Sequence, residues 1–333
     1  MLVSTGFQVL YEGVNITDDI TNDVLSITYT DNEDGKVDDI SIILKDESKK
    51  WIGDWLPLRG DKVRLLIKPM NQIVLDCGQF EVDEVGASGP PTVMEFSAVS
   101  VSVKSAVRRE LKSKAWEKIT LKGIAETIAK FAGLELQFLL DEDNNPFYER
   151  EDQTEESDLN FLHRLSQDEG LSLKITDSQL VIFEQAMFEE KEPIAKITLG
   201  VDDVISWSFG SQSSDLYKSC TCKYRLPKKR KAISYTWEDP NVDYGSNLKI
   251  RKCVANVDEA KRKAKAALRH KNRYQSTGAL TLVGDTRMVA GVTISVSGIG
   301  KFSGKYLVSK ATHSISQSGY VVNIELRKVL VGY

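Results

Sequence analysis

The chain has 333 residues, with 44 basic and 48 acidic side chains and a formal net charge of -4. A single hydrophobic core seldom grows past about 250–300 residues, so we expect two or three domains. The charge balance gives no global attraction to nucleic acid or anionic membranes, and 41% hydrophobic with 28% charged residues excludes a disordered or collagen-like chain.

Membrane and secretory segments are not expected. No stretch approaches the roughly 20 apolar residues that a membrane helix needs. The N-terminal sequence MLVSTGFQVLY has neither the basic nor the apolar region of a secretory signal. The four cysteines are too few for a disulfide scaffold and indicate a reducing compartment.

Short segments with alternating apolar and polar residues fill the first hundred residues, which is the period of a half-buried strand. Turn-forming sequences at 31–35 and 88–91 separate some of them. Several short strands at this spacing predict an antiparallel barrel, which we place at residues 1–105. The expected strands are 7–11, 24–30, 39–45, 61–68, 78–85 and 92–101.

The hydrophobic period changes near Thr120, which is expected to cap a helix that ends before Gly133. A strand follows, then a second helix capped by Ser157 and a hairpin with its turn near 177–178. This order of helix, strand, helix and hairpin predicts a small α+β domain over residues 106–190.

Strands return after Pro193 and predict a second β-barrel domain over residues 191–333. One helix is expected to be inserted near 257–273, capped by Asn256. Small apolar residues form a narrow stripe on this otherwise basic helix, namely Ala260, Ala264, Ala267 and Leu268. The expected strands are 204–210, 216–224, 231–237, 278–284, 292–298, 304–315 and 319–328.

The two strand-rich ends share a pattern. Gly-x-aromatic-x-Val occurs at 78–82 and again at 304–308. The apolar start of the next strand follows the aromatic residue by the same 14 positions, at Met94 and at Tyr320. The pattern predicts one barrel used twice in the chain. Coincidence stays open as the alternative, because glycine, aromatic residues and valine are common in strands.

Cysteines and histidines offer no catalytic or metal-binding pattern. Cys220 and Cys222 share one face of a strand, but a zinc site needs about four ligands and only Cys253 and a distant histidine remain. We therefore expect buried packing. The histidines lie in no known catalytic motif, and the helix dipole explains His270 near a helix end. They are His163, His270 and His313. We expect no catalytic residue, no metal site and no cofactor.

Two charged clusters suggest other functions. Acidic residues crowd the approach to the second helix, and a glycosidase needs two opposed carboxylates. The helix dipole and a solvated surface loop are the preferred explanation of the cluster. These residues are Glu149, Glu151, Asp152, Glu155, Glu156 and Asp158. The basic run 227–231 and the helix 257–273 suggest nucleic-acid binding. A solvated hairpin turn would also explain the run, and the positive charge could instead bind an acidic partner protein.

Two segments carry a more specific pattern. The first is the motif E-S-D-x-x-F-L-x-R-L-x-x-x-x-G, preceded by a helix at 120–134. Its residues are Glu156, Ser157, Asp158, Phe161, Leu162, Arg164, Leu165 and Gly170. The second, at 284–328, holds Gly304-x-Tyr306-x-Val308, His313, Gly319-Tyr320 and Arg327-Lys328. Together they resemble the late control protein D family of phage baseplate hubs and the N-terminal part of type VI secretion spike trimer proteins.

The resemblance implies a mainly β fold with an α+β insertion and two related antiparallel β-barrel domains per chain. Three chains would form a homotrimer with a pseudo-six-fold ring. The motif residues would serve the fold, with Phe161, Leu162 and Leu165 packing the helix and Glu156 and Asp158 in its first turn.

The implied function is structural. The protein would be the baseplate hub of a contractile phage tail or a headless tail-like particle such as a bacteriocin, adapting the three-fold central spike to the six-fold tail tube. Its partners would be the spike, the tail tube initiator protein, the tape-measure protein and other baseplate proteins, with DNA passing through the channel unspecifically. The location would be the baseplate of a virion or tail-like particle that is assembled in the bacterial cytoplasm.

The chain ends soon after its last expected strand, so we expect the spike and any cell-wall hydrolase to be separate polypeptides. A peptidoglycan-degrading tail enzyme using residues 149–158 is the main alternative, which digestion of purified cell walls would detect. A nucleic-acid-binding factor is the other alternative, and its DNA affinity would fall steeply with salt.

Overall fold

The computed structural model describes residues 5–100, 107, 110–140, 145–176, 179–213, 216–225 and 232–332. The fold is mainly β, as the sequence predicts, and its strands form sheets of 13, two, three and three strands. Among the described residues, no helix is long and apolar enough to cross a membrane. The basic run 227–231 and the turn expected at 177–178 lie outside the described residues.

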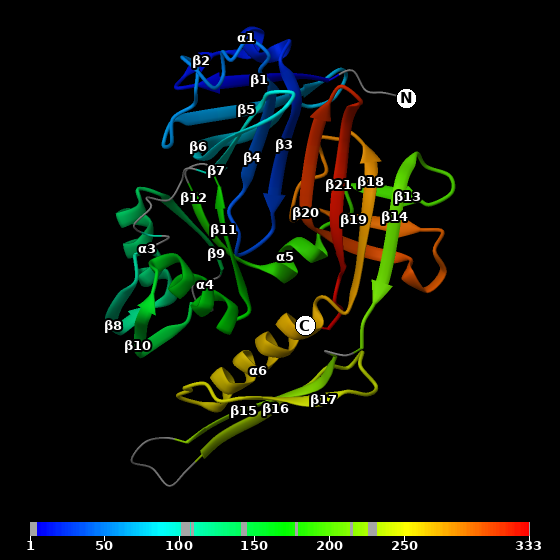
Figure 1. The fold of residues 1–333 in the computed structure, drawn as a ribbon. Helices are drawn as coiled ribbons and strands as arrows, with labels where there is room; N and C mark the ends of the chain where they lie inside the picture. The colour runs from blue at the N-terminus through cyan, green and yellow to red at the C-terminus, as the bar shows by residue number, and fades with distance from the viewer. Residues whose placement is uncertain are drawn as a thin grey trace.

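The N-terminal part forms one half of the large sheet (Figure 1). All six strands expected here are confirmed, because alternating apolar residues give each strand one buried face, as in the regular alternation along 62–69. The elements are β1 (Thr5–Tyr11), β2 (Val14–Asn15), α1 (Thr17–Thr21), β3 (Val24–Asn32), β4 (Asp39–Lys45), β5 (Lys62–Pro69), β6 (Leu75–Ser88) and β7 (Val93–Ser100).

The α+β part has its own hydrophobic core. The expected helix caps are confirmed: Thr120 accepts a hydrogen bond from Gly123 N at 3.2 Å, and Gly133 ends the helix with φ 81°. The elements are β8 (Lys112–Thr120), α3 (Leu121–Ala132), β9 (Glu135–Leu139), β10 (Phe147–Glu156), α4 (Asp158–Asp168), β11 (Leu171–Thr176), β12 (Gln179–Glu184) and α5 (Gln185–Glu190).

A two-stranded ribbon was not expected in this part. β8 and β10 pair antiparallel, so the acidic cluster at 149–156 lies on a strand and not in a loop. Both strands are mostly exposed and rich in charged residues, so they lack the apolar alternation by which a strand is recognised in sequence. Glu156 ends β10 and precedes the helix, so its expected place in the first helical turn is wrong.

The C-terminal strands complete the large sheet, in which β20 pairs with β3. One hydrophobic core runs beneath strands from both ends of the chain. The elements are β13 (Ala195–Thr198), β14 (Val204–Ser211), β18 (Ser276–Val283), β19 (Thr293–Ser297), a 3-10 turn η2 (Gly300–Phe302), β20 (Gly304–Ser316) and β21 (Gly319–Lys328).

The insertion between β14 and β18 is larger than the single helix expected there. It comprises a separate three-stranded sheet covered by α6 (Val257–Asn272), with a small core of its own (Figure 1). Asn256 caps the helix as predicted, accepting from Glu259 N at 2.8 Å. Its strands are β15 (Tyr217–Arg225), β16 (Ala232–Glu238) and β17 (Ser246–Ile250).

The internal repeat appears in the order of the strands. β3, β4, β7, β6 and β5 lie side by side in that order, and β14, β18, β21, β20 and β19 repeat it. The Gly-x-aromatic-x-Val segments occupy equivalent strands with the same register. Leu65 lies opposite Gly78 and Val63 opposite Phe80, as Val296 lies opposite Gly304 and Ile294 opposite Tyr306.

Irregularities in the ladders also repeat. The register of β6 against β7 shifts between Val82 and Glu84, and that of β20 against β21 shifts between Val308 and Lys310. A second shift falls after Val24 in β3 and after Val204 in β14. Since β-bulges are specific local features, their recurrence at equivalent positions supports a true repeat.

One detail of the predicted repeat is wrong. Met94 and Tyr320 are not equivalent, because the pairing places Met94 opposite Ala87 and Val322 opposite His313, which are equivalent positions. The second hairpin is longer by two residues, which shifts its return strand relative to the first. Within the described residues neither half closes on itself; the two halves are instead joined edge to edge through β3 and β20.

Candidate functional site

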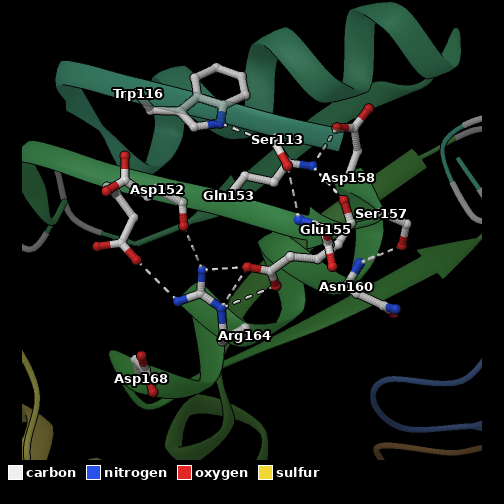
Figure 2. Close-up of polar contacts among 12 residues, drawn as sticks. Ser113, Trp116, Asp152, Gln153, Glu155, Ser157, Asp158, Asn160, Arg164 and Asp168 are labelled. Carbon is white, nitrogen blue, oxygen red and sulfur yellow. Dashed lines mark hydrogen bonds and ion pairs between the residues drawn. The ribbon is translucent and has the colours of Figure 1, made fainter. Parts of the chain in front are cut away.

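The acidic cluster is organised around Arg164 on α4. Arg164 points from the helix towards β10 (Figure 2), where its guanidinium contacts Glu156 at 2.8 Å and Glu151 at 3.0 Å. It also donates to the carbonyl oxygen of Asp152 at 3.3 Å. Burial disfavours its charge, but the hydrogen bonds that Arg164 donates to Glu156 and Glu151 outweigh burial and raise the pKa of Arg164.

The start of α4 is held by a second set of contacts. The Ser157 hydroxyl accepts from Asn160 N at 3.3 Å, which confirms the expected cap. Asp158 is buried, pairs with Lys112 at 2.5 Å and accepts from Gln153 Nε2 at 3.0 Å. Gln153 in turn accepts from Trp116 Nε1 at 3.3 Å (Figure 2). The motif therefore fixes the helix against the β8–β10 ribbon.

This arrangement does not resemble a glycosidase site. Glu151 and Glu156 face one shared cation, and Asp158 is paired with another. A hydrolase instead needs two carboxylates that flank a bound sugar. A pocket of about 230 Å³ beside α6 is lined by Glu169, Glu184 and Arg262 among others, and by no residue of the 149–158 cluster. Phe161, Leu162 and Leu165 are buried in the core, as predicted.

The turn between β3 and β4 contacts several parts of the chain. We call residues 31–38 the acidic turn. Asp31 pairs with Lys174 of β11 at 2.5 Å and accepts from Ala290 N at 2.8 Å. Asp34 lies 3.4 Å from both His163 and Arg273, and it accepts from Leu173 N at 3.2 Å. These contacts join the α+β part to the large sheet.

Glu33 of the acidic turn enters a buried ion network. It pairs with Arg327 of β21 at 2.6 Å, and Arg327 also pairs with Glu189 of α5 at 2.5 Å. Arg269 of α6 contacts the same Glu189 at 2.7 Å. Arg327 is fully buried, and the two carboxylates outweigh burial and raise its pKa. Four regions of the chain thus meet at one network.

Close packing reinforces the acidic turn. Gly35 has φ 70°, and a Cβ there would lie 2.7 Å from His163 Nε2, so only glycine fits this position without displacement of the histidine. Its amide donates to Leu173 O at 3.4 Å. In the sequence, residues 31–35 are recognisable only as a turn. Nothing in local sequence shows that its acidic side chains bind residues more than a hundred positions away.

Asp38 gives the acidic turn a pH dependence. It accepts from Asn32 N at 2.8 Å, while burial, followed by the nearby charge of Asp31, raises its pKa to about 7. A carboxyl with a raised pKa binds its proton more tightly in the folded chain than in the unfolded chain. Its contribution therefore lowers stability as the pH rises from about 4 towards 7.

We expect Asp38→Asn to raise the free energy of unfolding at pH 8 by up to about 4 kcal/mol, because an amide keeps the acceptor and cannot ionise. The gain should vanish below about pH 4, where the wild-type carboxyl is neutral in both states. Urea unfolding across this pH range measures the effect, with Asp54→Asn on the exposed surface as control. Equal gains at pH 4 and pH 8 would contradict the assignment.

The histidines and cysteines lie apart from any shared site. His313 is fully buried, hydrogen-bonds Tyr320 Oη at 2.8 Å and stacks on Tyr29, and burial lowers its pKa to about 4. Burial, with the charge of Arg273, also lowers the pKa of His270 to about 4, so the helix dipole does not hold it as a cation. Cys220 and Cys222 are buried against α6, as predicted. Within the described ranges, no three His, Cys, Asp or Glu residues are grouped to hold a metal ion.

The basic side chains of α6 mostly serve internal contacts. Lys263 pairs with Glu259 at 3.1 Å and with Glu169 at 3.6 Å, and Arg262 approaches Glu169 at 3.5 Å. Lys265 lies over the ring of Trp237. These contacts leave the helix a weak candidate for nucleic-acid binding.

Comparisons with known proteins point to phage tails. A family model described as YQBQ-like matches residues 229–327. The chain is 25% identical to the probable baseplate hub protein of Escherichia phage 186, over 97% of this chain and 93% of that protein.

Solved structures share the fold. The 43 kDa tail protein of prophage MuSo2 from Shewanella oneidensis matches with a TM-score of 0.75 and 15% identity, covering 98% of both chains. An Escherichia coli component of the type VI secretion system matches with a TM-score of 0.58 and 14% identity, over 93% of this chain and 75% of that one. The resemblance to baseplate hubs and type VI spike proteins noted in the sequence is confirmed.

Proposed function

We infer that this chain is a structural baseplate hub protein of a contractile phage tail or a phage-tail-like particle. A relative named as a probable baseplate hub protein aligns over nearly the whole length of this chain. This chain also has the fold of a phage tail protein. The ESD motif and the acidic turn support the same role, since both use their charges to hold parts of the chain together.

We propose further that three copies form the hub and adapt a three-fold spike to a six-fold tube. The single observation that carries this proposal is the internal repeat, with its shared strand order, register and bulges. A chain with two similar halves presents six similar surfaces when three copies surround an axis. Such a ring can contact a hexameric tube on one face and a trimeric spike on the other.

The proposed partners are the central spike, the tail tube initiator protein, the tape-measure protein and other baseplate proteins, with assembly in the bacterial cytoplasm before incorporation into a particle. DNA would pass through the ring without specific contacts. We also propose that the chain has no catalytic role. The pairing of its clustered carboxylates with Arg164 and Lys112 supports this view.

We expect the purified chain, alone or with its spike, to sediment at about three times 37.2 kDa. Analytical ultracentrifugation of both samples makes the measurement. A chain that stays monomeric in both would contradict the trimer. The finding would leave the fold and the tail-protein resemblance intact.

A further inference from the structure

Among the edges of the large sheet that have no partner in the described residues, one belongs to β14 and another to the second half of β6. β14 pairs with β18 along one edge, and no described strand pairs with its other edge. The second half of β6, residues 84–88, pairs with β7 alone. The two edges are separated by β18, β21, β20, β3, β4 and β7 in the order of the sheet, so they do not meet within one chain.

The internal repeat shows how such edges join. β3 is the equivalent of β14, and the second half of β20 is the equivalent of residues 84–88 of β6. Within the chain these two equivalents pair antiparallel, with Thr28 opposite Ser314 and Asp31 opposite Ala311. One copy of the contact is therefore already formed between the halves of a single chain.

Burial distinguishes the joined edges from the unjoined ones. Ile27 of β3 is 1% exposed, whereas Trp207 at the equivalent position of β14 is 54% exposed. His313 of β20 is fully buried, whereas Ala87 at the equivalent position of β6 is exposed. The same positions are covered where the partner strand is present and uncovered where it is missing.

β14 also lacks the usual protection of an edge strand. Natural edge strands carry charges, prolines or bulges that prevent pairing with another chain. β14 has a bulge near its start, but Val204–Ser211 contains no charged residue and no proline, and it exposes Ile205 and Trp207. Such an edge favours addition of a strand from another copy.

We propose that β14 of one copy pairs antiparallel with residues 84–88 of β6 in the next copy, repeating the β3–β20 contact between chains. The equivalence of the two halves sets the register, with Ser208 opposite Ser88 and Ser211 opposite Val85. Each chain then contributes β14 to one contact and residues 84–88 of β6 to another. This inference rests on the proposed trimer, and it names the surface that joins its subunits.

The contact is head to tail, so it generates a ring when the rotation closes. Internal β3–β20 contacts would alternate with β14–β6 contacts between copies around that ring. Three chains give six such contacts, one for each repeat. The free edges of β14 and of residues 84–88 would then be paired in every copy.

Engineered disulfides test the pairing. In a Cys253→Ser background, Ser88→Cys combined with Ser208→Cys should oxidise to a covalent trimer on a non-reducing gel, and reductant should reverse it. Directly opposite positions of antiparallel strands bring Cβ atoms within disulfide range. The matched control combines Ser88→Cys with Ser246→Cys, which is also exposed, lies on β17 and should stay uncross-linked.

A charge introduced into β14 gives an independent test. Trp207→Lys should convert the trimer into monomers by sedimentation, with an unchanged circular dichroism spectrum, because Trp207 is half exposed within the chain. Val201→Lys, at an exposed position outside β14, is the control and should leave the trimer intact.

The outcomes separate the two proposals. A trimer that forms without the Ser88–Ser208 cross-link, or that persists in Trp207→Lys, overturns the pairing and leaves the proposed hub function in place. A chain that stays monomeric with and without its spike overturns both. A covalent trimer that is specific to the matched pair supports the pairing.

Discussion

Arg327→Met should lower the free energy of unfolding by about 3–5 kcal/mol, because it leaves two buried carboxylates without their shared cation. Arg327 is fully buried and contacts Glu33 at 2.6 Å and Glu189 at 2.5 Å. In this variant Glu189 retains its ion pair with Arg269. The loss of stability therefore comes mainly from Glu33. Urea unfolding followed by circular dichroism measures the change.

Two further variants define the cause. Lys328→Met, at the next and less buried position of β21, should change stability by less than about 1 kcal/mol. Adding Glu33→Gln to Arg327→Met should recover part of the loss, because the uncompensated charge is then removed. If Arg327→Met proves as mild as Lys328→Met, the network does not stabilise the fold.

Local sequence patterns predicted most of the large sheet. In segments such as 39–45 apolar residues mostly alternate with polar ones, and the structure contains this strand with the same bounds. The helix caps at Thr120, Ser157 and Asn256 were also predicted, because a cap depends on residues within one turn. These features rest on short-range chemistry that a single sequence displays.

The contacts that organise the molecule could not be predicted in the same way. Glu33 and Arg327 are 294 residues apart, and Asp31 and Lys174 are 143 apart. No local period links such pairs. The β8–β10 ribbon was missed for a different reason, since its largely exposed strands lack the regular apolar alternation that would reveal them.

The repeat was predicted from one short pattern, but its strongest evidence is in the backbone. VLSITYT and VISWSFG, beginning at Val24 and Val204, look only loosely alike as sequences. Their equivalence becomes clear from the identical register shift after each valine. Pairing information of this kind depends on partner strands that a sequence pattern does not identify.

Phe161→Ala should lower the stability of the α+β part by about 3–5 kcal/mol, as truncation of a fully buried aromatic side chain does. Phe161 belongs to a hydrophobic core that is separate from the core under the large sheet, and it stacks on Trp116 at 6.1 Å. If residues 106–190 are a domain, as the sequence predicts, the effect should stay within them.

Hydrogen exchange resolves where the loss occurs. In Phe161→Ala, backbone amides of α3, α4 and β11 should exchange faster, whereas those of β18 and β21 should keep their wild-type rates. Phe147→Ala, at an exposed aromatic residue of β10, is the control and should leave both groups unchanged. Faster exchange throughout the large sheet would instead show that the contacts of the acidic turn couple the two cores into one cooperative unit, and the predicted domain boundary would then be wrong.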